Sequence, residues 1–408
     1  MNGAKKKILY LSLTGMSEPL GRSQVLEYIY DIVNFFDVAI LSCEKPHALL
    51  QTPGLSDEIK RHGVNWIHIP YSNRFGLFSA SWQFFRFTVW AVVYVMRKKP
   101  DIVHARSLIP AAVALIVKSL FHIKTLFDIR GFFVDEKVDS NSLIKGSALY
   151  VFLKKIERFV FCNSDYIITL TQRGKTIIEQ EYGIDSKLIT VIPTCVNTAL
   201  FKAVSIQEKV QLRQTLRLPQ KKILVHHGDV KGWYDFRSEV ALFREMYNKD
   251  KNVFLLILNR YQKGYIEKVL KDFHIEQEAY ELRSVEFADI PSYLNACDLS
   301  LFFIKPTYSK QASHPTKFAE NTACKLFSIS NRGVGDMDFY AETYKTALLI
   351  DLPSLSFTLH ETAVRTLELI NNPAQRGSND GYARLIRECF SNEIAIERYL
   401  SVYNILSH

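Results

Sequence analysis

Short runs of apolar residues alternate with longer stretches of helical periodicity along most of this chain. In the first half, we expect strands at residues 8–13, 38–43, 64–69, 102–104, 125–127, 166–170 and 188–192. We expect helices between them, near residues 22–35, 78–98, 108–121, 147–162 and 172–182. The strand runs are apolar throughout rather than alternating, which is typical of a parallel sheet covered by helices on both faces.

The same pattern restarts after a polar stretch that follows residues 192–197. Strands are expected at 223–227, 253–258, 284–287, 299–304, 327–330 and 347–350, and helices near 235–247, 262–273, 289–296 and 315–325. A length of 408 residues suits two domains. We therefore predict an α/β chain with two facing, doubly wound domains and a cleft between them, at residues 1–197 and 206–392. Residues 393–408, the end of a helical stretch near 381–406, form a helical tail that could pack back on either domain, the first being the one we favour.

The net charge of +9 indicates an anionic partner. Most of the excess, seven charges, falls within residues 1–200. Nucleic acid, a phosphorylated substrate and an acidic membrane all fit that charge, but no nucleic-acid-binding motif is present, so we expect no nucleic acid. The longest apolar run, at residues 87–96, is far shorter than the roughly 20 residues of a membrane span. We expect a cytoplasmic protein, in contact with the inner membrane face at most from its periphery.

The cysteines show no CxxC pair, which argues against a zinc site. Their apolar surroundings, for example at Cys162 and Cys297, predict buried free thiols.

Two loops of the first domain have residues that could bind a ligand at the carboxyl edge of its sheet. Gly15 and Gly21 follow the first strand and allow close approach of the backbone, with Arg22 beside them. They are six residues apart, so a dinucleotide fingerprint is absent, and an ordinary long loop is an equal interpretation. His104 and Arg106 end the fourth strand and point to the same side. A strand end with solvated side chains explains that pair equally well.

A third loop, at residues 128–136, concentrates charge after the strand at 125–127. Its charged residues include Asp128, Arg130, Asp135 and Glu136. A carboxylate here could accept a proton from a hydroxyl group, and Arg130 could hold a phosphate. Ion pairing on the surface is the alternative.

In the second domain, residues 226–234 follow the first strand. Gly228 and Gly232 allow close approach of the backbone, and Lys231 could neutralise a phosphate. The adjacent His226 and His227 suggest a metal, but neighbouring strand residues face opposite sides, so we do not favour one.

The segment SHPTKFAENTAC, at residues 313–324, predicts the start of a helix. Pro315 suits the first turn, which places Ser313 or His314 at the N-cap. Thr316 then lies in the opening turn, where backbone N–H groups and the helix dipole favour an anion.

Lys317 lies in that turn too, and Glu320 follows it by three residues, so both can face one ligand. A phosphate near Lys317 and hydroxyl groups near Glu320 describe a nucleotide; a surface ion pair is the alternative. Asp336 and Asp338 could hold a divalent metal, but no third oxygen ligand is evident.

Together, these segments resemble the retaining glycosyltransferases of family 4, which have the GT-B architecture of two Rossmann-like domains. The resemblance spans nearly the whole chain and is carried by residues 17–26, 101–107, 128–131, 192–197, 228–234 and 313–324. It implies that the second domain binds a nucleotide-sugar, linked to uridine or guanosine diphosphate. It also implies that no metal or other cofactor is needed, because cations and helix N-termini stabilise the departing diphosphate.

By this resemblance, Glu320 matches the second glutamate of the family's E-x7-E motif, which binds the donor ribose, and Lys317 is placed for the diphosphate. The residues assigned to the donor are Gly228, Lys231, Gly232, Ser313, His314, Thr316, Lys317 and Glu320. Those assigned to the acceptor are Gly15, Gly21, Arg22, Arg106, Asp135 and Glu136. Those assigned to catalysis are Lys317, His104, Asp128 and Arg130.

The sequence departs from the family pattern at several places, which include Asn197, where the family has an Asp, and Lys325, where it has a Gly. Ala312 stands eight residues before Glu320, where the family has its first glutamate. Asp229 and Lys231 stand where the family has an Arg…Lys pair. The resemblance implies an enzyme that transfers a sugar to a glycan or lipid-linked acceptor in polysaccharide or lipopolysaccharide biosynthesis. A catalytically impaired module that binds a nucleotide or glycan is the alternative.

The stretch at residues 82–99 mixes aromatic and basic side chains. It could lie on an acidic membrane as an amphipathic helix. A core helix with a basic end is an equal interpretation.

Overall fold

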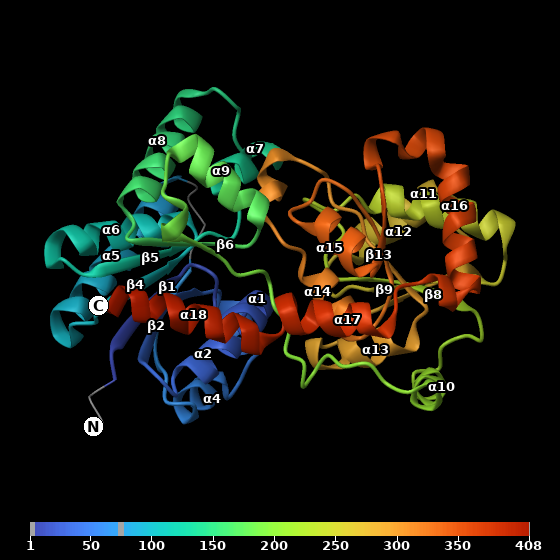
Figure 1. The fold of residues 1–408 in the computed structure, drawn as a ribbon, viewed down its shortest axis with the longest axis horizontal. Coiled ribbons are helices and arrows are strands. Elements are labelled where there is room, and N and C mark those ends of the chain that lie inside the picture. Colours follow the sequence, from blue (N-terminus) through green and yellow to red (C-terminus); the bar gives the residue numbers. More distant parts are fainter. Residues whose placement is uncertain (1–4, 72–76, 408) are drawn as a thin grey trace. The chain divides into compact units, whose positions relative to one another are not determined.

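The computed structural model describes residues 5–71 and 77–407 and divides the chain into two compact units. Unit 1 comprises Met1–Pro193 together with Asn392–His408, and unit 2 comprises Thr194–Ser391. Each unit has one parallel sheet with helices around it (Figure 1). The predicted fold class, α/β with two doubly wound parallel sheets, is confirmed.

The sheet of unit 1 has the strand order β3-β2-β1-β4-β5-β6-β7, and every described pairing is parallel. The strands are β1 (Lys7–Ser12), β2 (Asp37–Glu44), β3 (Asn65–Pro70), β4 (Ile102–Arg106), β5 (Lys124–Asp128), β6 (Tyr166–Thr169) and β7 (Ile189–Val191). The order reverses at β1 and β4, so the loops after these two strands diverge there. Ligands of such sheets bind at this point, beyond the carboxyl ends of the strands.

The last helix of the chain, α18 (Asn392–Ser407), belongs to unit 1 and packs against α2 and β4. Figure 1 shows it in red alongside α2. The other helices of the unit are α1 (Pro19–Gly21), the π turn η1 (Arg22–Leu26), α2 (Glu27–Ile32), α3 (Pro46–Leu50), α4 (Leu55–Arg61), α5 (Leu77–Lys98), α6 (Leu108–Phe121), α7 (Phe133–Asp139), α8 (Ala148–Asn163), α9 (Gln172–Tyr182) and η2 (Ser186–Leu188).

The sheet of unit 2 has the order β10-β9-β8-β11-β12-β13. Its strands are β8 (Lys222–His227), β9 (Val253–Leu258), β10 (Tyr280–Arg283), β11 (Leu299–Leu301), β12 (Ser328–Asn331) and β13 (Ala347–Ile350). Its helices are α10 (Ile206–Thr215), α11 (Phe236–Lys249), α12 (Lys263–Asp272), η3 (Gln277–Ala279), η4 (Phe287–Asp289), α13 (Ile290–Ala296), η5 (Tyr308–Ala312), α14 (Thr316–Ala323), α15 (Met337–Tyr344), η6 (Leu352–Ser354), α16 (Leu355–Asn371), η7 (Pro373–Gln375), α17 (Asn379–Leu385) and the π turn η8 (Ile386–Phe390).

Two apolar cores cover the two faces of this sheet. Leu224 of β8 packs into the core that includes α11, α12 and α16, whereas Ile223 and Val225 pack into the core that includes α14, α15 and α17. Successive residues of a strand point to opposite faces, so both faces need apolar side chains. This explains why β8 reads as a continuous apolar run.

Several predicted elements are wrong. The strand expected at 284–287 lies earlier in the chain, at β10. The side chains of β10 are half-buried, and its sequence YELR contains no apolar run that would mark a strand. Residues 133–139 form α7 rather than part of a loop. The sequence reading missed α10 and α16, although Ser205 and Glu208 form a capping box at the start of α10. The helical stretch expected near 381–406 is interrupted, since Ser391 is extended and separates η8 from α18.

Two further observations concern membranes and thiols. Within the described ranges, no helix is both long and apolar enough to span a bilayer. Cys297 is buried as predicted, whereas Cys162 is exposed because it lies on the outer side of α8, so that prediction was wrong.

Candidate functional site

The loop after β8 is held close to α14 in unit 2. Gly228 and Gly232 both have positive φ angles, +85° and +68°, which L side chains adopt only with strain. A Cβ atom on Gly228 would lie 3.1 Å from Cε of Lys317. Glycine at position 228 therefore allows both the loop conformation and the approach of Lys317.

Lys317 is buried, with 3% of its surface exposed. Its Nζ donates to the carbonyl oxygen of Asp229 at 3.1 Å, lies 3.3 Å from Nε2 of His226 and sits 3.7 Å above the ring centre of Tyr234. An ammonium group has three N–H donors, so these three neighbours can occupy all of them. Lys317 thus fastens α14 to the loop after β8.

The charge state of Lys317 depends on its surroundings. Burial lowers its pKa to about 8, although the carboxylates of Glu239, Asp229 and Glu320 partly oppose the shift. An anion that bound beside Lys317 would favour its charged form. Without a ligand, Lys317 is therefore mostly charged at neutral pH and loses its proton above about pH 8.

Behind Lys317 lies a buried pair that the sequence reading missed. Nδ1 of His226 lies 2.6 Å from Oε2 of Glu239, and Oε1 of Glu239 accepts the N–H of Phe303 at 3.0 Å. Both side chains are almost fully buried. An ionised carboxylate only accepts, so Nδ1 of His226 is the donor, and Nε2 faces Lys317 and the carbonyl of Asp229. Glu239 lies on α11, which has the amphipathic sequence of an ordinary surface helix. Nothing in that sequence indicates that Glu239 contacts His226.

Glu320 connects α14 to the last residue of β8. Its Oε2 lies 2.9 Å from Nε2 of His227. Burial lowers the pKa of His227, while Glu320 opposes that shift. The side chain of Glu320 is 13% exposed, more than that of Lys317. Lys317 and Glu320 therefore both face the end of β8, and Glu320 keeps some access to solvent.

The remaining residues assigned to the donor lie in different environments. α14 begins at Thr316 with Pro315 as its N-cap, so the predicted cap by Ser313 or His314 was wrong. His314 is buried, its ring 4.7 Å from that of Phe390. Thr316 and Ser313 are half-buried.

Two further positions in this region can be compared with the family pattern. Lys231 is exposed, its Nζ 4.8 Å from the ring centre of Tyr265. Ala312, which replaces the first motif glutamate, is fully buried. The chain therefore has a small apolar side chain in its core at that position.

The residues considered for metal binding have other partners. His226 points to Glu239 and His227 to Glu320, as expected for neighbours on a strand. Asp338 accepts from Arg332 and from the N–H of Gly333. Across the described residues, no group of three or more His, Cys, Asp or Glu side chains is placed to hold a metal ion.

In unit 1, His104 and Asp128 lie in a buried polar cluster beneath α18. Nδ1 of His104 lies 2.7 Å from the hydroxyl of Tyr403, and the hydroxyl of Tyr399 donates to Asp128 at 3.3 Å. Arg130 approaches Oδ1 of Asp128 at 3.5 Å and Nε2 of His104 approaches Oδ2 at 3.6 Å. Arg106, at the end of the same strand as His104, is buried as well. Both tyrosines come from the far end of the chain, so no local motif indicated them.

The electrostatics of this cluster favour ionised Asp128 and neutral His104. Burial by itself raises the pKa of Asp128, but Arg130 and His104 outweigh it and hold the pKa at about 2. Burial lowers the pKa of His104 despite the nearby Asp128. The aspartate charge is thus balanced by Arg130 rather than by an imidazolium.

The other residues assigned to the acceptor mainly stabilise their own loops. A Cβ atom on Gly21 would lie 2.0 Å from the carbonyl oxygen of Gly15, so these glycines permit a tight loop. Buried Glu44, which the sequence reading missed, accepts from the N–H groups of Met16 and Ser17.

Three charged residues of this group are placed by helices. Arg22 pairs with Glu58 at 3.0 Å. Asp135 pairs with Lys154 at 3.0 Å. Glu136, in the first turn of α7, is half-buried.

Comparison with known proteins defines the class. Residues 36–200 match the model of the family described as Glycosyltransferase Family 4. The resemblance seen in the sequence is thus confirmed over these residues, which identify a glycosyltransferase domain. No match was found among proteins of curated function.

Solved structures match the chain over nearly its whole length. A glycosyltransferase from Rickettsia africae is 14% identical, with 99% of each chain covered and a TM-score of 0.72. Sucrose-phosphate synthase from Thermosynechococcus elongatus is 15% identical, with 98% of this chain and 99% of that chain covered and a TM-score of 0.75. HepE from Anabaena in complex with UDP-glucose is 13% identical, with coverage of 98% and 99% and a TM-score of 0.71. At this identity, the matches show the shared GT-B fold.

Proposed function

We propose that this glycosyltransferase moves a sugar, with retention of configuration, from a nucleotide-diphosphate-sugar to a hydroxyl group of a glycan or lipid-linked acceptor in polysaccharide biosynthesis. One observation carries the proposal: Gly228, Lys317 and Glu320 converge at the carboxyl end of β8. Ligands of parallel sheets bind at such an edge. A UDP-linked donor is supported by HepE, which shares the fold and was solved with UDP-glucose.

In this proposal, unit 2 binds the donor. The partly exposed carboxylate of Glu320 accepts hydrogen bonds from the ribose hydroxyls. Lys317 and the backbone N–H groups at the start of α14 stabilise the negative charge that develops on the departing diphosphate. The donor phosphate itself accepts the proton of the acceptor hydroxyl on the same face. No metal takes part.

Unit 1 binds the acceptor in this proposal. Arg130 keeps 15% of its side-chain surface exposed and can contact an acceptor. His104 and Asp128 are buried against Tyr403 and Tyr399, which supports a positioning role: they fix Arg130 and the end of β4. Peripheral contact with an acidic membrane would bring this unit to a lipid-linked acceptor.

A catalytically impaired binding module is the second candidate, because Ala312 replaces the first motif glutamate. Release of nucleoside diphosphate separates the two functions. The protein is incubated with a panel of UDP- and GDP-sugars and glycan acceptors, and binding is followed in parallel by thermal shift. An enzyme binds a donor and releases diphosphate, whereas a module binds without release. If neither a nucleotide-sugar nor a glycan raises the melting temperature, both candidates are wrong.

A further inference from the structure

Three neighbouring helices of unit 1 expose an unusual amount of apolar surface. α5 packs against α6 and α6 against α8, so they form one layer on the sheet. Half of the exposed large apolar side chains in the described chain lie within residues 82–159, a fifth of the sequence. Those on the three helices are Trp82, Phe85, Val89, Trp90, Met96, Leu120, Leu149, Val151, Phe152 and Phe159.

The exposed side chains follow the helical period. On α5, Trp82, Phe85 and Val89 are spaced by three and four residues, so they share one face. Their exposed fractions are 59%, 56% and 42%. Between α5 and α8, Ile109, Ala112 and Ile116 of α6 are half-buried, and Leu120 is exposed beside Ser119. Each of the three helices therefore has exposed apolar side chains.

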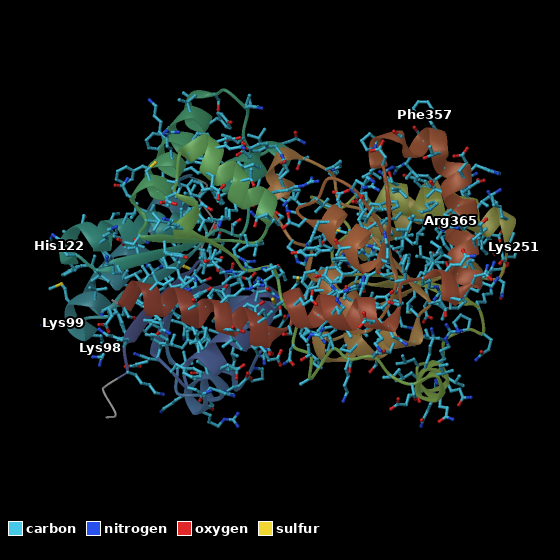
Figure 2. All side chains as sticks on the ribbon, viewed as in Figure 1. Lys98, Lys99, His122, Lys251, Phe357 and Arg365 are labelled. Carbon is cyan, nitrogen blue, oxygen red and sulfur yellow. The ribbon has the colours of Figure 1, made fainter. Side chains whose placement is uncertain are left out.

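The charges on these helices have one sign. The sequences of α5, α6 and α8 contain a single acidic residue, Glu157, which is buried and paired with Lys154. Their basic residues are Arg86, Arg97, Lys98, Lys118, Lys154, Lys155 and Arg158. Lys99 follows directly after α5, and Figure 2 labels Lys98, Lys99 and His122 at the ends of α5 and α6. Over the described part of this layer, no acidic side chain is exposed.

The layer also has a direction. Crossover helices run antiparallel to the strands, so the first turns of α5 and α8 lie at the carboxyl edge of the sheet. The aromatic side chains Trp82, Phe85 and Phe152 lie in the first halves of these helices, nearer to that edge. The same edge carries the loops assigned to the acceptor, at residues 14–24 and 128–136. Arg97 and Lys98 lie at the opposite edge.

We propose that the outer face of α5, α6 and α8 docks unit 1 on the surface of an anionic lipid bilayer. The aromatic side chains insert at the boundary between head groups and acyl chains, and the basic side chains meet lipid phosphates. A protein partner fits less well, because protein interfaces are depleted in lysine, whereas four of the seven basic residues of these helices are lysines. The link to a lipid-linked acceptor rests on the proposed function, but docking is measured without any substrate.

The test is flotation of the full-length protein with vesicles of neutral phosphatidylcholine, and with vesicles that also contain phosphatidylglycerol. We expect strong flotation with acidic vesicles, weak flotation with neutral ones, and loss at high salt. The variant Arg97→Gln/Lys98→Gln/Lys99→Gln is expected to lower the partition coefficient about 100-fold, since each basic residue contributes about fivefold. Its matched control, Lys263→Gln/Lys268→Gln/Lys271→Gln on α12 of unit 2, is expected to retain the wild-type coefficient within about threefold.

A second variant tests the apolar face independently. Trp82→Ser/Phe85→Ser/Phe152→Ser is expected to lower the coefficient about tenfold or more. Tyr261→Ser/Phe357→Ser removes two rings of unit 2 that are more exposed than these and should have little effect; Figure 2 labels Phe357. All substituted positions are exposed, and thermal melts check that each variant folds.

Three results would overturn the proposal. One is equal flotation with neutral and acidic vesicles, another is equal loss in the variants and their controls. The third is a lipid-free wild-type dimer that the Trp82 variant converts to monomers in light scattering, because the face would then join two copies of this chain. Binding of a nucleotide-sugar without docking refutes the docking alone. Docking without nucleotide-sugar binding refutes the proposed function alone.

Discussion

The buried ammonium group of Lys317 should make the stability of unit 2 depend on pH in a defined direction. Its pKa is about 8 in the folded chain, below the value near 10.5 that an unfolded chain has. Between these values the unfolded state binds more protons, so the free energy of unfolding rises with pH. From pH 7 to pH 9.5 the rise is about 2 kcal/mol. Below pH 8 the folded chain bears the cost of a buried charge.

The variant Lys317→Met removes this titration and keeps a side chain of similar length. We expect the difference in unfolding free energy, wild type minus variant, to grow by about 2 kcal/mol from pH 7 to pH 9.5. Urea unfolding followed by circular dichroism, at several pH values in this range, measures it for both proteins. Subtracting the variant cancels the other groups that titrate there. If this difference in unfolding free energy stays constant with pH, Lys317 does not have the lowered pKa that its burial implies.

Four further changes test other parts of the structure. Gly228→Ala should lower the free energy of unfolding by about 1 kcal/mol or more, because φ is +85° and the new Cβ would contact Lys317. Calorimetry measures the loss. The control Gly264→Ala lies on a helix with open space around it and should show no loss. Glu320→Ala should lower kcat/KM for the donor about 10- to 100-fold, the value of a hydrogen bond to a charged group; unchanged kinetics would remove Glu320 from the site. Tyr403→Phe should destabilise unit 1 by about 1 kcal/mol in urea unfolding, because it removes the 2.7 Å hydrogen bond to His104, and equal midpoints would contradict that. Activity should survive EDTA; its loss, with recovery in Mg²⁺, would show that a metal takes part.

The fold was largely predictable because its strands are buried on both faces. The apolar runs of β1, β2, β8 and β9 are direct consequences of helices on each side of the sheet. The edge strand β10 is half-buried and lacks such a run, so its position could not be read correctly. The tail posed a different problem. The break at Ser391 has no Pro or Gly to mark it, and the sequence alone left the partner of the last helix open.

Residues of the candidate site were predictable only where they lie together in one short segment of the sequence. The spacing of Lys317 and Glu320 predicted that both face the same side of one helix. In the structure, both side chains face the end of β8. Glu239 could not be found, because a buried ion pair between separate elements leaves no pattern in either segment. The same holds for Tyr399 and Tyr403, which reach Asp128 and His104 across more than 270 residues of sequence.

The central claim is that unit 2 binds a nucleotide-sugar at Glu320. The most direct measurement is calorimetric titration of the tightest-binding UDP- or GDP-sugar into three proteins: wild type, Glu320→Gln, and Glu361→Gln as a control on the exposed face of α16. The account predicts a Kd about tenfold weaker for Glu320→Gln and unchanged for Glu361→Gln. Equal affinity in all three proteins, or no binding to the wild type, would contradict it.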